Sequence, residues 1–205
     1  MPTLIAGPVT GYLVPTSIVD ADHPEVIERS RALGAPGARA TEPQREAYAE
    51  RAFTWVRDEI AHNVDVRDTR VTVTASQVLA EGVGVCFAKS HLLAALLRAG
   101  GVPAGLCYQR LADDVGGHLV HGLVAVHLRD GWHRLDARGN RPGLDARFDL
   151  DVERVAWTAR PELGEADYRD VLVDAAPEVI EVLRGAADAL ALCAGGLPAQ
   201  LPLRS

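Results

Sequence analysis

The stretch GVGVCFAKSHLLAALLRAGGVPA, residues 82–104, carries the strongest structural signal in the chain. A glycine-punctuated loop over residues 82–85 leads into a run from Cys86 to Ala99 that has little polar circumference. A helix of this composition belongs inside a protein, and two consecutive glycines at its end stop it. The sequence therefore predicts a buried helix that begins at a cysteine.

Helices are predicted before this stretch as well. Pro24–Leu33 is a candidate short helix, and Thr41 followed by Gln44 forms a capping box for a longer one. The longer helix carries an apolar stripe to about His62, made of Tyr48, Ala52, Trp55, Val56 and Ile60. Thr74 or Ser76 is expected to cap another short helix that ends at Ala80.

Strands are predicted after the buried helix. The expected strands are Val102–Arg110, His118–Leu128 and Trp132–Asp136, the last two joined as a hairpin across residues 129–131. A further strand is expected near the start, at Tyr12–Val19, and a helix from Pro177 to Gly195-Gly196 near the end. Helices followed by adjacent antiparallel strands indicate an α+β domain and not a βαβ repeat.

Composition excludes several classes of protein. The 205 residues carry a formal charge of −7, and no Lys/Arg cluster offers a basic face to nucleic acid or to an anionic membrane. Residues 1–15 have no basic leader, so we expect no signal peptide, and no apolar run reaches the roughly 20 residues of a membrane span. Three cysteines without an export signal favour free thiols in the cytoplasm, in a single domain over residues 1–205.

Cys86 is the first candidate for chemistry. Unpaired N–H groups at a helix N-terminus favour the thiolate over the thiol. A cysteine nucleophile also needs a histidine, usually oriented by Asp or Asn. Four histidines lie on the predicted hairpin, at positions 118, 121, 127 and 133, and His121 can share one face of it with Asp136.

The turn decides whether these two side chains meet. A turn centred between residues 128 and 129 puts His121 directly opposite Asp136, about 5 Å away. A tight turn at Asp130-Gly131 instead pairs Asp136 with Ala125, roughly 13 Å from His121. Contact between the two side chains is therefore expected to require the wider loop or a bulge.

The chain resembles the transglutaminase-like superfamily of papain-fold thiol enzymes over about residues 41–140. The residues that carry the resemblance are Gly84-x-Cys86, Leu92-Leu93-x-Ala95-Leu96-Leu97-Arg98-Ala99-Gly100-Gly101-Val102-Pro103-Ala104, His121, Gly131-Trp132-x-x-Leu135-Asp136 and the upstream Trp55-Val56 and Ile60. The resemblance implies a papain-like core at 41–140, with extensions over 1–40 and 141–205. The chain departs from the family pattern at Leu123, where the family often has Trp, and in the residues that follow Asp136.

The resemblance also implies roles for three residues. Cys86 would be the nucleophile, His121 the general base and acid, and Asp136 the group that orients His121. The reaction would be acyl transfer or hydrolysis at amide bonds of a protein or peptide, without a metal or an organic cofactor. Gln77 and Tyr108 are expected to add polar contacts near the site.

Other interpretations stay open at this point. Within the same chemistry the chain could be a cysteine peptidase or amidase, and outside it a non-catalytic binding domain that keeps the fold. A zinc site from the hairpin histidines lacks a ligand-pair spacing such as His-Glu-x-x-His. Cys107 and Cys193 lack nearby partners in the sequence and are expected to be packing residues.

Overall fold

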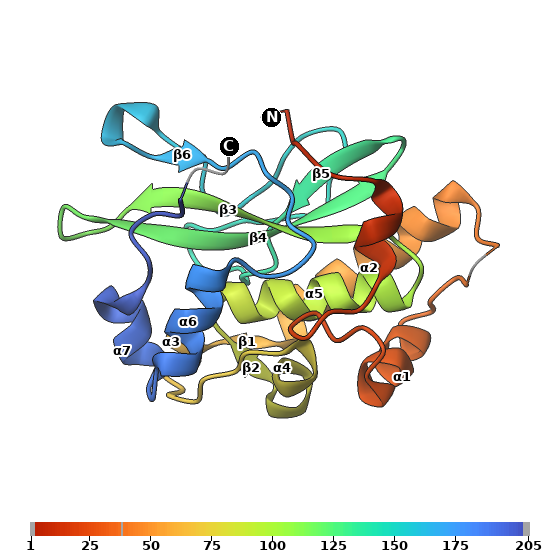
Figure 1. The fold of residues 1–205 in the computed structure, drawn as a ribbon, viewed down its shortest axis with the longest axis horizontal. Coiled ribbons are helices and arrows are strands. Elements are labelled where there is room, and N and C mark those ends of the chain that lie inside the picture. The colour runs from red at the N-terminus through yellow and green to blue at the C-terminus, as the bar shows by residue number, and fades with distance from the viewer. Residues whose placement is uncertain (1–2, 38, 203–205) are drawn as a thin grey trace.

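The computed structural model describes residues 3–37 and 39–202. The elements are the 3-10 helix η1 (Val9–Leu13), α1 (Pro24–Ala32), α2 (Glu42–Glu59), β1 (Ala61–His62), α3 (Asn63–Val66), α4 (Ala75–Glu81), β2 (Val83–Gly84), α5 (Cys86–Ala99), β3 (Ala104–Ala112), β4 (His118–Leu128), β5 (Gly131–Leu135), the 3-10 helix η2 (Pro161–Leu163), β6 (Ala166–Asp167), α6 (Pro177–Gly185), α7 (Ala189–Ala191) and a π-helical turn η3 (Leu192–Gly196). A layer of helices covers one face of the sheet (Figure 1). The fold is mixed α and β, with antiparallel pairing throughout its main sheet, as predicted.

The buried helix α5 spans the predicted residues, Cys86–Ala99. Its residues from Cys86 to Arg98 are all buried, and it packs against β3 and β4 on one side and against α1, α2 and α4 on the others. The even distribution of apolar side chains around this helix is explained by these neighbours, since no face of it is left to water. The predicted capping box of α2 is present, Thr41 with Gln44, and of the two residues expected to cap α4 it is Thr74 that does so, in a capping box with Gln77.

The main sheet has the strand order β5-β4-β3-β6. β3 pairs with β4 along its whole length, from Ala104 opposite Val126 to Ala112 opposite His118. After β6 the chain continues beside β3, where Leu106 and Leu172 exchange two backbone hydrogen bonds. A second, two-residue parallel sheet joins β1 to β2 just before α5.

The two ends of the chain differ from expectation. Tyr12–Val19 forms no strand; its first residues belong to the 3-10 helix η1, and Tyr12 packs against the far face of the sheet. The helix that starts at Pro177 ends at Gly185, because the backbone at Ala186 is extended and Asp188 caps a new short helix. The apolar periodicity continues past this break, so it gives no sign of it.

The last residues pack onto the same core as the central helix. Leu192 and Leu201 are buried in it, and the carbonyl of Pro198 accepts a hydrogen bond from the Val120 N–H. β5 pairs with β4 only from Val124 to Leu128, so this contact lies on the part of the β4 edge that β5 leaves free. The chain after residue 141 is thus part of the structure around β4. Within the described residues, no helix is both long and apolar enough to cross a bilayer.

A buried histidine makes stability depend on pH. His91 on α5 is 1% exposed, and its Nδ1 donates to the carbonyl of Val73. Burial lowers its pKa to about 4, so between pH 6.5 and 4 the unfolded chain takes up a proton that the folded chain does not. Lowering the pH from 7 to 5 is expected to cost about 2 kcal/mol at this residue. His91→Leu should reduce that loss in urea unfolding at the two pH values; an equal loss in both proteins would contradict the assignment.

Candidate active site

Cys86 opens α5 directly after the small β1-β2 sheet. The N-cap residue is Val85, whose side chain accepts no hydrogen bond, so it leaves the first-turn N–H groups of the helix uncapped. Gly84 fits tightly beneath that turn, because a Cβ atom there would lie 3.0 Å from the Ala88 Cβ and 3.2 Å from the Thr72 Oγ1. Cys86 itself is 7% exposed. Its side chain therefore lies at the start of the helix and is almost fully enclosed.

A close approach of strand and helix brings β4 beside Cys86. A Cβ atom on Gly122 would lie 3.1 Å from the Phe87 Cα and 3.3 Å from its N atom, both of which are backbone. Only glycine lets β4 come this near to the first turn of α5. His121, the preceding residue, is thereby carried to the side of Cys86.

His121 and Asp136 form a buried pair. The Nε2 of His121 lies 2.9 Å from the Oδ2 of Asp136, and the two side chains are almost fully enclosed. Asp136 also accepts the N–H groups of Arg138 at Oδ1 and of Ala156 at Oδ2, both at 3.0 Å. Burial raises the pKa of this carboxyl, but His121 and these hydrogen bonds outweigh it and hold the pKa below its ordinary value.

The register of the hairpin differs from both arrangements considered from the sequence. Leu128 pairs with Gly131, so the tight turn consists of Arg129 and Asp130, both with positive φ. Continued past the end of β5, this register places Asp136 opposite Leu123, two residues from His121 and on the same face. The expectation that contact requires a wider loop or a bulge is wrong, because a diagonal pair across a tight hairpin is within reach of an imidazole and a carboxylate.

Cys86 lies close enough to the same imidazole to act on its pKa. Burial lowers the pKa of His121, but the charges of Asp136 and Cys86 and the hydrogen bond to Asp136 raise it to about 10. Since Nε2 is bound to Asp136, the Nδ1 atom is the one available to the sulfur. The structure thus brings together the three residues named from the sequence.

Two further side chains enclose His121. The ring of Trp157 meets it edge to face, with centroids 4.9 Å apart, from a segment without regular structure. Gln109 pairs with His121 across the β3–β4 ladder and donates to Trp157 and Asp167. An aromatic ring beside a His–Asp hydrogen bond keeps water from competing for it.

His62, which looks in the sequence like the end of a helix, is a further residue near the site. It lies on β1, paired with Gly84, and is 8% exposed. Its Nδ1 accepts the Val64 N–H, so its proton is on Nε2. Burial, and then the charge of Arg138, lower the pKa of His62 to about 3, which keeps it neutral. The one sequence signal is its place just before the segment that leads to Cys86.

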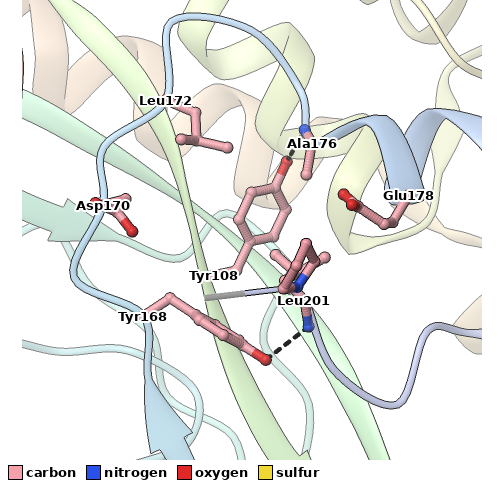
Figure 2. Close-up of a pocket in the computed structure, with 8 residues that line it drawn as sticks. Tyr108, Tyr168, Asp170, Leu172, Ala176, Glu178 and Leu201 are labelled. Atoms are coloured by element: carbon pink, nitrogen blue, oxygen red, sulfur yellow. Dashed lines mark hydrogen bonds between the residues drawn. The ribbon is translucent and has the colours of Figure 1, made fainter. Parts of the chain in front are cut away.

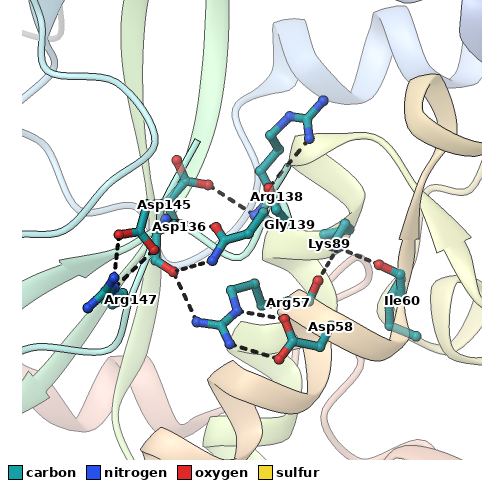
Figure 3. A network of polar contacts seen from close by, with 11 residues as sticks. Arg57, Asp58, Ile60, Lys89, Asp136, Arg138, Gly139, Asp145 and Arg147 are labelled. Carbon is teal, nitrogen blue, oxygen red and sulfur yellow. Dashed lines mark hydrogen bonds and ion pairs between the residues drawn. The ribbon is translucent and has the colours of Figure 1, made fainter. Parts of the chain in front are cut away.

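Arg138 is a buried cation that follows Asp136 by two residues. It is 5% exposed, pairs with Asp65 through both terminal nitrogens at 2.7 and 2.9 Å, and lies over the ring of Trp157 at 5.9 Å. Its backbone N–H fixes Asp136, as Figure 3 shows. Arg138, one of the residues after Asp136 that depart from the family pattern, is therefore a buried cation next to the site, and it pairs with an aspartate that is open to solvent.

Two residues expected near the site have other roles. Gln77 completes the capping box of α4. The hydroxyl of Tyr108 accepts the Ala176 N–H, and the ring lines a small pocket between β3 and the C-terminal segments (Figure 2). Burial raises the pKa of Cys107 to about 12 and its side chain lies in the core, in agreement with a packing role.

The hairpin histidines do not gather around a common point. His118 and His133 bind the carbonyls of Leu163 and Leu128, and His127 packs against Trp132. Among the described residues, no three His, Cys, Asp or Glu side chains are placed to hold a metal ion.

Known proteins resemble parts of this chain. Three solved structures resemble it: a provisionally named cysteine protease from Cytophaga hutchinsonii (18% identity, 64% of this chain, 42% of that one, TM-score 0.47), a provisionally named protease from Parabacteroides distasonis (14%, 55%, 23%, 0.39) and a TGase (15%, 73%, 43%, 0.40). The chain spans less than half the length of each. Comparison with curated proteins gives no match. The sequence profile of the transglutaminase-like superfamily matches residues 32–137, just over half of the chain, and the chain belongs to this superfamily.

Proposed function

We propose that this chain is a thiol enzyme that transfers or hydrolyses acyl groups at amide bonds of proteins or peptides. Cys86 is the nucleophile, His121 the general acid and base, and Asp136 the residue that orients His121. The observation that carries the proposal is the buried His121–Asp136 hydrogen bond beside the start of α5, where Cys86 lies close enough for its charge to act on the imidazole. A histidine with its pKa raised in this way is protonated at neutral pH and can pair with a thiolate.

The first half of the reaction forms a thioester. The Cys86 sulfur attacks the amide carbon, and the electron pair of the C=O bond moves to oxygen. The Cys86 N–H and the Nε2–H of His62 stabilise this oxyanion. The C–N bond then breaks as His121 gives its proton from Nδ1 to the departing amine or ammonia. Asp136 holds the imidazole in position throughout.

The second half returns the enzyme to its starting state. The neutral His121 takes a proton from water or from an amine as that nucleophile attacks the thioester carbonyl. The tetrahedral intermediate collapses, the C–S bond breaks, and the sulfur leaves as a thiolate beside the imidazolium. Water gives an acid, which is the outcome of a peptidase or amidase, and an amine gives a new amide.

Trapping the thioester tests the proposal. The protein is incubated with a panel of glutamine peptides and small amides, with or without hydroxylamine. The masses of its tryptic peptides are then measured by mass spectrometry. We expect an acyl adduct on the peptide that contains Cys86, and hydroxamate formation when hydroxylamine is present. Release of acid alone would identify a hydrolase. Ammonia release without any adduct in quenched samples, at an unchanged rate in Cys86→Ala, would contradict the proposed mechanism.

The limited exposure of Cys86 favours a second candidate, a non-catalytic binding domain. Iodoacetamide distinguishes the two, because a thiolate paired with an imidazolium reacts at pH 6 almost as fast as at pH 8. A rate that rises about tenfold per pH unit, as for an ordinary thiol, would favour the binding domain.

His62→Phe is expected to slow acylation without disturbing the nucleophile. Phenylalanine keeps the ring but has no Nε2–H, so the oxyanion loses one donor, which typically costs about 10²- to 10³-fold in kcat. Stopped-flow acylation by p-nitrophenyl acetate measures this rate, and iodoacetamide alkylation, which forms no oxyanion, serves as its control. An acylation rate within twofold of wild type would remove His62 from the mechanism.

A further inference from the structure

The only lysine of the chain lies in the core, next to the proposed nucleophile. Lys89 follows Cys86 by three residues on α5, which is about one turn, and is 1% exposed. Taking a cation out of water is costly, and methionine would fill a similar volume without that cost. Burial, and then the charge of Arg138, lower the pKa of Lys89 to about 7. The hydrogen bonds of Lys89 must therefore offset the cost of burying its ammonium group.

Those contacts join α5 to the end of α2. The Nζ of Lys89 donates to the carbonyl of Arg57 at 3.2 Å and to that of Ile60, as Figure 3 shows. The last carbonyls of a helix have no partner within it, and a cation there also faces the negative end of the helix dipole. One side chain thus satisfies two otherwise orphaned acceptors.

The position of Ile60 gives these contacts a consequence for the site. Ile60 directly precedes β1, and β1 carries His62. Lys89 therefore fixes the start of β1 to the helix turn that follows Cys86. A third neighbour is Gly139, where a Cβ atom would lie 3.5 Å from the Lys89 Nζ, so the ammonium group also lies beneath the segment that follows Asp136.

We propose that Lys89 is a positioning residue, which sets the separation between the Cys86 sulfur and the Nε2–H of His62 through its hydrogen bond to Ile60. This inference rests on the proposed function and assigns to Lys89 the placement of the oxyanion donor. It touches neither the substrate nor the reacting atoms. Its removal leaves the sulfur and His121 in place and lets the donor move away.

Two rates at the same sulfur test the proposal. Acylation by p-nitrophenyl acetate develops an oxyanion and needs the donor, whereas iodoacetamide loses iodide in a displacement that forms none. In Lys89→Met we expect the acylation rate to fall about 10- to 100-fold, because a displaced donor loses part of the effect of a donor that is removed entirely. The alkylation rate should stay within about twofold. In the His62→Phe background, Lys89→Met should add little, since both act on one interaction.

Arg98→Met is the matched control. Arg98 is a second buried cation on α5, at its far end, where it donates to the carbonyls of Ala104, Val14 and Val173. Its loss should lower the thermal midpoint and leave the ratio of the two rates unchanged. Lys89→Gln keeps an N–H donor and should recover part of the acylation rate; it also replaces Lys89→Met if that variant does not fold.

Three outcomes overturn the inference. The first is an equal fall of the acylation and alkylation rates in Lys89→Met. The second is an unchanged acylation rate in both Lys89→Met and Lys89→Gln. The third is that Lys89→Met lowers acylation as much in the His62→Phe background as it does alone. Failure of the proposed function looks different, because Cys86→Ala would then release nitrophenol as fast as the unaltered protein.

Discussion

Cys86→Ala is expected to reduce turnover to the uncatalysed background. Loss of the nucleophile in a comparable hydrolytic site lowers kcat by about 10⁶, because the remaining groups cannot form a covalent intermediate. The side chain lies at the start of a helix that is buried all round, so a smaller apolar residue should leave the fold intact. Ammonia release from the best amide substrate, measured against the unaltered protein, is the test.

Cys107→Ala is the matched control for this prediction. Cys107 is also buried, but its side chain lies in the small apolar cluster around Tyr12 and Leu123 on the far face of the sheet. Its replacement should cost about 1 kcal/mol of stability and leave turnover within twofold. Substantial turnover in Cys86→Ala, or loss of turnover in Cys107→Ala with the fold retained, would show that the nucleophile has been wrongly assigned.

The central helix and its sheet are predictable because local and tertiary preferences agree there. The run from Cys86 to Ala99 is apolar on all sides, and only a buried helix accommodates it. The capping box of Thr41 and Gln44 is a signal contained within four residues, and it begins α2 as predicted. Where several local signals indicate the same structure, that structure can be predicted from the sequence alone.

The candidate site is predictable in its residues but not in its register. The sequence places His121 and Asp136 on one hairpin, but the geometry of contact depends on which two residues form the turn. Arg129 and Asp130 both adopt positive φ, although neither is glycine. Asn-Gly or Asp-Gly is the usual signal for such a turn, and Asp130-Gly131 suggests it one position too late.

The surroundings of the site depend on contacts that no local pattern records. Trp157 reaches His121 from a segment without regular structure, and Pro198 pairs with Val120 across 78 positions of sequence. His62 lies at the end of an apolar stripe, which makes it look like the end of α2. Its role follows from β1 pairing with β2, a two-residue sheet too short to be recognised from periodicity.

Asp136→Asn is expected to lower kcat by about 10⁴ with little change in shape. The carboxylate accepts from His121, Ala156 and Arg138 through its two oxygens. The amide of asparagine has only one acceptor oxygen. Its NH2 group would face at least one of these three N–H donors, so that hydrogen bond is lost and the imidazole loses its orientation. The corresponding change in a serine protease triad costs about 10⁴ because the wrong histidine tautomer is held.

The same substitution should change how stability depends on pH. With the pKa of His121 raised to about 10, the folded chain holds a proton that the unfolded chain releases near 6.5. Stability from this pair is complete below pH 6.5 and is lost as the pH rises through 10. Asp136→Asn removes the main charge that raises this pKa. The stability advantage of the unaltered protein over the variant should therefore shrink from pH 6.5 to pH 10 in urea unfolding, and a constant difference would mean that the His121–Asp136 pair carries no extra proton.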